Sequence, residues 1–352
     1  MTKTVQKVGL LLLGNLVALS CFAQLGGSTS FGFLNLPTHA RTIALGGQNI
    51  TSSDQDVNMM TSNPALLVDS VANKLSVSYY PYFADVHSSA ISYAHSFKKA
   101  GLWGINVQNI SYGTFDQTNA LGQVTGTFQG SELAVTISHA RKIEHFALGA
   151  NLKLAQASLD TYRASGVFLD VGSVFIHPKK DFKFGLVIRN LGFSLGSFTP
   201  SQEFSMPLDI QLGLSFKPQR MPLRFSITAN QLQQFDIAFD DPSDDGKVDA
   251  LGNPLDEKAS FTDKLSRHFT LGGEFVFSKN LNLRFGYNFL KRRELAIESR
   301  QAMVGFSFGF MIRIKKLEVA YSRNTQFVGG GVNAFTVTLN TKDIFKKKRV
   351  IN

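Results

Sequence analysis

The chain has 352 residues, of which 43% are hydrophobic and 18% charged, and this composition is compatible with one or two domains. It holds 31 Phe and 30 Gly against 10 Pro, carries a formal net charge of +10 and contains one cysteine, which excludes an internal disulfide. Abundant Phe and Gly with few prolines favour extended strands and tight turns and disfavour a mainly helical protein.

The amino-terminal residues 1–23 are predicted to form a secretory signal peptide. Lys3 and Lys7 provide a positive n-region, Val8–Leu19 an apolar stretch, and small residues a cleavage site before Gln24. The apolar stretch is shorter than the ~20 residues that a membrane-spanning helix needs. A lipoprotein in which Cys21 is acylated is the alternative. After cleavage no cysteine remains, and a closed barrel is one way for an exported chain to be rigid without disulfides.

From residue 73 onward, apolar and polar residues alternate in successive segments. Leu283 and Phe285 fall on one side of an extended chain, and Arg284 and Gly286 fall on the other. About fourteen such segments follow one another, each roughly 8–15 residues long, as tilted transmembrane strands require. They are 74–83, 86–97, 102–115, 124–139, 146–157, 167–176, 182–189, 208–216, 223–232, 269–277, 283–290, 302–312, 317–323 and 332–340.

The connections between these segments are alternately long and short. The short ones all carry Lys or Arg, whereas the others grow to the acidic segment 235–268. This alternation is typical of an up-and-down antiparallel barrel with loops at one rim and turns at the other. With an even strand number, both termini and the short-turn rim are predicted to face the periplasm. The basic turns suit anionic lipid headgroups, or alternatively an acidic periplasmic partner.

One face of each segment is polar enough for a lumen, and the other is apolar enough for lipid. The sequence therefore predicts an all-β protein, a transmembrane antiparallel up-and-down β-barrel of about 14 strands at 73–345. A basic periplasmic tail, 346–352, follows the barrel. Trp103, Tyr79, Tyr82, Tyr93 and Tyr112 are expected in aromatic girdles at the membrane interfaces.

Residues 24–72 do not alternate, and they are predicted to form a plug, or hatch, folded into the lumen. Within this segment Asn63-Pro64-Ala65 is typical of a turn into a short helix with proline in its first turn. The residues singled out as the plug motif are Arg41, Gly46, Gly47, Asn63, Pro64 and Ala65.

The plug segment resembles that of the FadL-like outer-membrane barrels. The resemblance rests on the run from Phe31 to Gly47, on the aspartates Asp54 and Asp56, and on Asn63-Pro64-Ala65 ahead of the strands. Within them the plug is most similar to the PorV/PorQ group of the Bacteroidetes type IX secretion system, and the run from Phe31 favours the PorQ branch. The motifs cover about fifty residues, and the rest matches by strand number and length.

This resemblance implies a non-enzymatic barrel in the outer membrane of a Gram-negative, Bacteroidetes-type bacterium. It would anchor the attachment complex that matures secreted cargo and links it to lipopolysaccharide. The implied partners are a PorU-like sortase, a PorV-like barrel and a PorZ-like surface protein, besides outer-membrane lipid. A transporter of hydrophobic small molecules, as in the wider FadL-like group, is the alternative.

No catalytic motif accompanies the barrel: the sequence has neither a Gly-x-Ser-x-Gly elbow nor a His-Glu-x-x-His pair, and no enzyme is expected. No cofactor and no nucleic-acid partner are expected either. The acidic loop is the one segment for which a bound ion is considered. It faintly resembles a calcium loop but offers Gly252 where a bidentate glutamate is needed, so it is either a solvated loop or a surface for divalent cations or a basic partner. The loop residues singled out are Asp240, Asp241, Asp244, Asp245 and Asp249.

Overall fold

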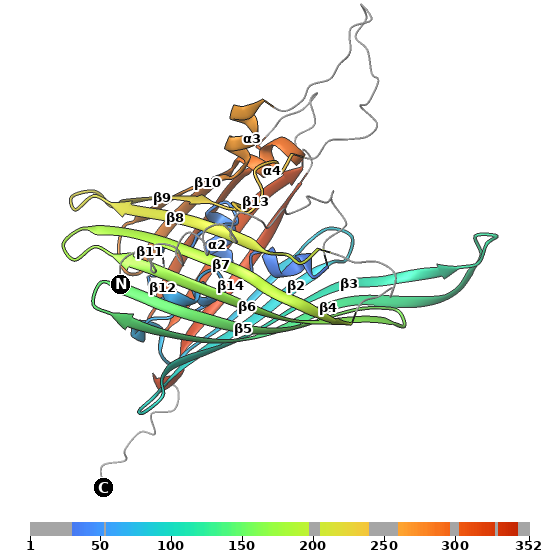
Figure 1. Cartoon of the computed structure of the whole chain (residues 1–352), viewed down its shortest axis with the longest axis horizontal. Helices are drawn as coiled ribbons and strands as arrows, with labels where there is room; N and C mark the ends of the chain where they lie inside the picture. The colour runs from blue at the N-terminus through green and yellow to red at the C-terminus, as the bar shows by residue number, and fades with distance from the viewer. Residues whose placement is uncertain are drawn as a thin grey trace, which may run out of the picture.

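The computed structural model describes residues 30–52, 54–196, 205–238, 260–295, 303–327 and 330–343. Within these ranges fourteen strands form one closed antiparallel barrel, in which β1 closes onto β14 (Figure 1). The prediction of an up-and-down barrel of about fourteen strands is confirmed. The strands are β1 Lys74–Pro81, β2 His87–Phe97, β3 Gly101–Thr118, β4 Val124–Ile143, β5 Phe146–Leu159, β6 Tyr162–Ile176, β7 Asp181–Gly196, β8 Asp209–Lys217, β9 Leu223–Ala229, β10 Phe269–Val276, β11 Leu281–Asn288, β12 Phe306–Ile314, β13 Leu317–Phe327 and β14 Gly330–Asn340.

The alternation read from the sequence sorts the side chains as a membrane barrel requires. On β12, Phe306, Phe308 and Phe310 are exposed on the outside, whereas Ser307 faces inward and is buried. The strand begins later than residue 302, where it was predicted to start. Gly305 has a φ of +85°, outside the extended region, and Val304 is buried in the turn before it.

The two rims differ in connection length at β7–β8, β9–β10 and β11–β12 only, because β3, β5, β6, β13 and β14 extend further at the loop rim than the sequence predicted. Short turns join β2 to β3, β4 to β5, β6 to β7, β8 to β9, β10 to β11 and β12 to β13. The start of β1 pairs with the end of β14, Lys74 opposite Asn340, at this same rim. At the other rim, α3 (Phe261–Arg267) lies in a connection that the sequence had suggested to be a loop, and α4 (Phe289–Leu295) replaces the last two residues of the predicted strand 283–290 and the start of the next loop. Among the described residues, no helix is long and apolar enough to cross a membrane.

Residues 30–52 and 54–73 lie inside the barrel as short helices and turns (Figure 1). The helices are η1 Gly32–Asn35, α2 Ala40–Ala44, η2 Val57–Thr61, η3 Pro64–Leu66 and η4 Asp69–Val71, and η5 Thr341–Asp343 follows the last strand. The buried apolar residues gather between this segment, called the plug below, and the barrel wall. Ile43 packs with Met311 and Ala334 of the wall, and Met60 packs with Ala94 and Leu102. The core of the protein is therefore the interface between plug and wall.

Candidate functional site

The plug approaches the wall so closely that glycine is required on the strands beside it. A Cβ at Gly286 of β11 would lie 2.2 Å from the backbone nitrogen of Gly46, and one at Gly309 of β12 would lie 2.8 Å from Cβ of Ala44. Gly46 and Gly47 both have positive φ, and the N–H of Gly47 donates to the carbonyl of Thr42 at 2.8 Å, which ends α2. These glycines thus turn the chain where it touches the wall.

Arg41, on α2, reaches into a cluster of charges on the wall. Its side chain is 1% exposed, and Nη2 lies 2.8 Å from Oδ2 of Asp54 and 2.9 Å from Oε1 of Glu274. Glu274 also accepts from Arg224 at 3.0 Å and from Arg284 at 3.0 Å, and Arg224 contacts Asp54. Two carboxylates and three guanidinium groups therefore join the plug to β9, β10 and β11.

The charges of this cluster compensate one another. Burial alone would raise the pKa of Asp54, but Arg41 and Arg224 hold that pKa well below its usual range. Burial likewise opposes the charge of Arg41, and the carboxylates of Glu274 and Asp54 outweigh it, so the pKa of Arg41 is raised. The cluster stays ionised and fastens the plug near the short-turn rim, because Arg224 and Arg284 lie at the starts of β9 and β11.

Asn63-Pro64-Ala65 forms the predicted turn, as the short helix η3. Asn63 caps it: Oδ1 accepts from the N–H of Ala65 at 3.0 Å, and Nδ2 donates to the carbonyl of Ile50 at 3.1 Å. The motif lies against glycines of β5 and β6, since a Cβ at Gly149 would be 2.5 Å from Pro64 and one at Gly172 would be 2.0 Å from Asn63. All three motif residues are buried, so they pack the plug against the wall.

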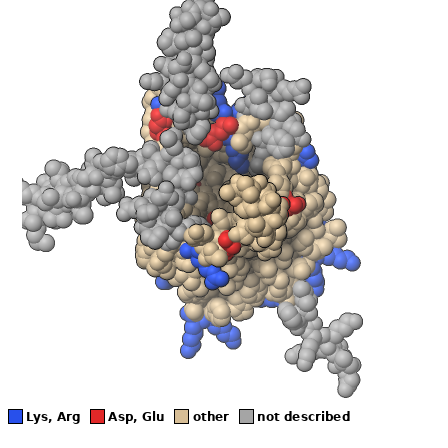
Figure 2. Space-filling view, turned by 90° about the vertical axis from the view of Figure 1, so that its right-hand side faces the viewer, with Lys and Arg blue, Asp and Glu red and all other residues tan. Residues whose placement is uncertain are grey.

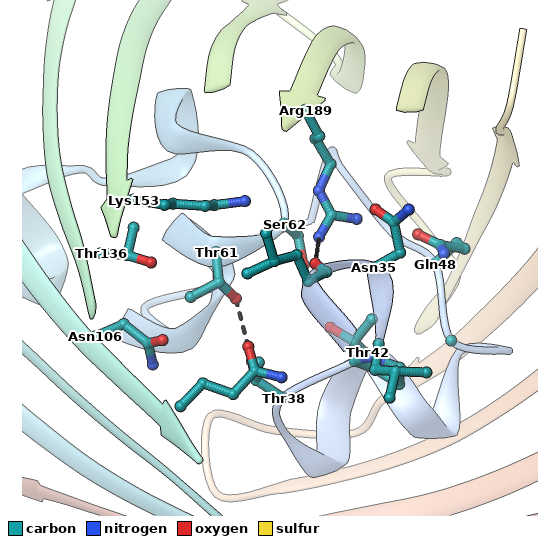
Figure 3. Close-up of a pocket in the computed structure, with 15 residues that line it drawn as sticks. Asn35, Thr38, Thr42, Gln48, Thr61, Ser62, Asn106, Thr136, Lys153 and Arg189 are labelled. Carbon is teal, nitrogen blue, oxygen red and sulfur yellow. Dashed lines mark hydrogen bonds between the residues drawn. The ribbon is translucent and has the colours of Figure 1, made fainter. Parts of the chain in front are cut away.

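A small polar chamber separates the plug from β3 to β7. Its volume is about 20 Å³, enough for roughly one water molecule. Figure 3 shows Lys153 and Arg189 reaching from the wall toward the plug, where Nη2 of Arg189 donates to the carbonyl of Leu34 at 2.9 Å. The ammonium group of Lys153 is neutralised by Asp170, whose Oδ2 lies 2.8 Å from Nζ. The same Nζ donates to Oδ1 of Asn190 at 2.7 Å. The chamber is therefore polar but offers no uncompensated lysine to an anion.

A larger cavity of about 480 Å³ lies at the loop rim, and that side of the molecule shows a recess (Figure 2). Its walls are mostly apolar or aromatic and come from the plug, from β1, β3, β13 and β14 with the β1–β2 connection, and from α4. The hydroxyl of Tyr80 donates to the carbonyl of Pro37 at 2.6 Å, and that of Tyr82 donates to Tyr80 at 3.3 Å. The residues that line it include Leu36, Pro37, Ile43, Tyr80, Tyr82, Val86, Ile110, Tyr112, Lys291, Glu294 and Val332.

Two charged side chains of α4 border this cavity. Burial lowers the pKa of Lys291 to about 8 and raises the pKa of Glu294. The aromatic residues correct one prediction: Trp103 and Tyr79 are exposed on the outside of the wall, but Tyr82 and Tyr112 line the cavity. Alternation alone could not separate them, because Tyr82 lies beyond the end of β1 and Tyr112 beside a bulge in β3.

The acidic-loop residues singled out from the sequence stay a prediction. Asp240, Asp241, Asp244, Asp245 and Asp249 lie in 239–259, outside the described residues. Glu274 is one of the site residues that were not predicted from the sequence. The sequence feature that could have identified Glu274 is its charge at a lumen-facing position of an alternating strand. Its cross-strand neighbours are Arg224 and Arg284.

The closed antiparallel barrel is similar in fold to solved barrel structures that include transporters and porins. The Ralstonia pickettii toluene transporter TbuX has a TM-score of 0.52 and 12% identity, with 88% of this chain and 99% of TbuX covered. A FadL homologue of Pseudomonas aeruginosa has a TM-score of 0.45 and 12% identity, with 86% and 98% covered. No protein-family model and no curated protein sequence matches the chain.

Proposed function

We propose that the chain is an outer-membrane barrel that takes up hydrophobic small molecules, which bind first in the apolar cavity at the loop rim. The cavity is the observation that carries this proposal. Its volume of about 480 Å³ falls within the ~300–1,000 Å³ typical of small-molecule sites, and few polar groups interrupt its walls. The fold that the chain shares with a toluene transporter supports the same class of ligand.

The polar, ion-paired plug below the cavity limits the routes by which a bound ligand could pass from the cavity through the barrel. An apolar molecule gains no binding free energy from contact with the charged cluster around Arg41. This cluster lies between the plug and the wall at the short-turn rim. Uptake therefore requires either a movement of the plug or an exit through the wall above it.

Binding can be tested on the purified full-length barrel in detergent. Toluene and 1-decanol should displace a solvatochromic dye from the cavity in a saturable manner. Val86→Trp fills the cavity and should weaken displacement by at least about tenfold, whereas Val337→Trp, on the lipid-facing side of β14, should leave it unchanged. Equal displacement from both variants, or no saturable binding to the unmodified barrel, would contradict the proposal.

A second candidate is a non-enzymatic anchor of a type IX attachment complex, with a PorU-like sortase, a PorV-like barrel and a PorZ-like surface protein as partners. Its support is the resemblance of the run from Phe31 to Gly47, together with a plug that is ion-paired to the wall. A rigid plugged barrel suits anchoring, which needs no open lumen. Affinity purification from gently solubilised outer membranes tests it: stoichiometric recovery of a sortase-like peptidase supports the anchor, and recovery of the barrel alone contradicts it.

A further inference from the structure

β3 and β4 extend well beyond the rest of the wall at the loop rim (Figure 1). β2 pairs with β3 only as far as Ser111, and β5 pairs with β4 only from Gly130. Past these points β3 and β4 pair only with each other, from Thr114 opposite Gln129 to Thr118 opposite Val124. Residues 114–129 thus form a free two-stranded ribbon, here called the β3–β4 ribbon.

The two edges of the ribbon are not equivalent. On the β4 side, the turn between β5 and β6 reaches the base of the ribbon, where the N–H of Asp160 donates to the carbonyl of Gln129 at 3.1 Å. On the β3 side, the connection between β1 and β2 reaches only Gly113, whose added Cβ would lie 3.3 Å from Asp85. Among the described residues, no strand other than β4 lies beside Thr114–Thr118. Its outward N–H and C=O groups are therefore available for pairing.

The composition of the ribbon leaves this edge unprotected. Proteins usually blunt a free strand edge with lysine, proline or other charges. Residues 114–129 hold no Lys, Arg or Pro, and Asp116 is their only charged residue. Thr114–Thr118 are all exposed, and the rings of Phe115 and Phe128 stack at 5.3 Å across the ribbon, which keeps its strands paired. An open edge with a single charged residue and no proline can accept an added strand.

We propose that Thr114–Thr118 binds an extended segment of another cell-surface protein as an added β-strand, with a basic residue opposite Asp116. The carboxylate of Asp116 has no ion-pair partner among the described residues, so it is free to select such a residue. A second copy of this chain is the less favourable occupant, because antiparallel self-pairing centred on Asp116 would place two carboxylates opposite each other. The inference goes beyond uptake and does not depend on whether the cavity takes a ligand.

The test uses the full-length barrel in detergent and capped nine-residue peptides of alternating Thr and Val. One peptide has Lys at its centre, a second has Glu there, and a third has Pro on both sides of a central Lys. Hydrogen exchange read by mass spectrometry should slow at Thr114–Thr118 with the Lys peptide. The Glu peptide should bind about two- to fivefold more weakly, as expected for cross-strand charge pairs. The Pro peptide should not bind, because it cannot pair along the edge.

Asp116→Lys should reverse the preference between the Lys and Glu peptides, whereas the matched control Asp160→Lys, on the neighbouring turn, should preserve it. Unchanged exchange at Thr114–Thr118 up to the solubility limit of the peptides would overturn the proposal. So would equal binding of the Pro peptide, or protection confined to the β4 side. A dimer in sedimentation that disappears when residues 114–129 are replaced by a two-residue turn would assign the edge to a second copy instead.

Discussion

Arg41 and Glu274 lie 233 residues apart in the sequence, yet Nη2 of the arginine is 2.9 Å from Oε1 of the glutamate inside the barrel. Their side chains are 1% and 2% exposed. A buried ion pair is costly to break from one side, because the remaining charge stays buried without its partner. This pair therefore fastens the plug to the wall, and its removal should loosen the plug.

Arg41→Met removes the plug's charge while keeping most of the side-chain volume. It should cost about 3 kcal/mol of stability, the range found when one partner of a buried pair is removed. Thermal unfolding in detergent and protease cleavage within the plug measure the effect. The control is Arg293→Met, which breaks the ion pair of the 59% exposed Arg293 with Asp263 and should cost at most about 1 kcal/mol. Equal losses in the two variants would show that the Arg41 cluster does not fasten the plug.

Gly286→Ala places a Cβ 2.2 Å from the backbone nitrogen of Gly46, where neither backbone can give way cheaply. Overpacking of this kind costs about 1–3 kcal/mol, and here it should displace the plug. Protease cleavage within residues 40–52 should accelerate while the strands stay intact. Gly32→Ala is the matched control, because a Cβ at Gly32 would meet nothing within 4 Å. A plug as resistant in Gly286→Ala as in the unmodified chain would rule out close docking at this point.

His39 should make the docking of the plug sensitive to mild acid. Burial lowers the pKa of this 1% exposed side chain to about 4, from an ordinary value of 6.5. The undocked histidine binds a proton below about pH 6.5, whereas the docked one does so only near pH 4. Stability is therefore constant above pH 6.5 and falls by about 3 kcal/mol as the pH drops from 6.5 to 4.

Thermal unfolding across this pH range checks the prediction about His39. His39→Gln should flatten the profile, because glutamine cannot take up the proton. His87→Gln, at an exposed position beside Tyr79, should leave the profile as it is. A profile that is steep in both variants would assign the pH dependence to other groups.

Asn63→Ala removes both the cap of η3 and the donor to Ile50. A lost cap costs about 0.5–2 kcal/mol, and the unsatisfied carbonyl of Ile50 adds to it. Asn63→Ser keeps an acceptor for the N–H of Ala65 without introducing a buried charge, and it should restore part of the cap. Thermal unfolding should rank the alanine variant below the serine variant, with Asn119→Ala at the exposed ribbon tip close to the unmodified chain. The reverse order would mean that the cap is not what Asn63 supplies.

The sequence by itself determined the strand number, the three longest connections and the inward or outward direction of most side chains. The direction follows from a local rule, the period of two along each strand, which places Leu283 and Phe285 on one face and Arg284 on the other. The turn at Asn63 was equally readable, because an N-cap and a proline act on their immediate neighbours.

Only the tertiary structure decided which charges meet and where the wall leaves space. Arg41 pairs with Glu274 because barrel closure brings the plug to β10, and no local pattern encodes a contact across 233 residues. Tyr82 and Tyr112 line one cavity because they lie where regular alternation ends. The free edge at Thr114–Thr118 exists because β2 begins only at His87, opposite Ser111 of β3, so the pairing of this edge depends on a neighbouring strand and cannot be read from β3 alone.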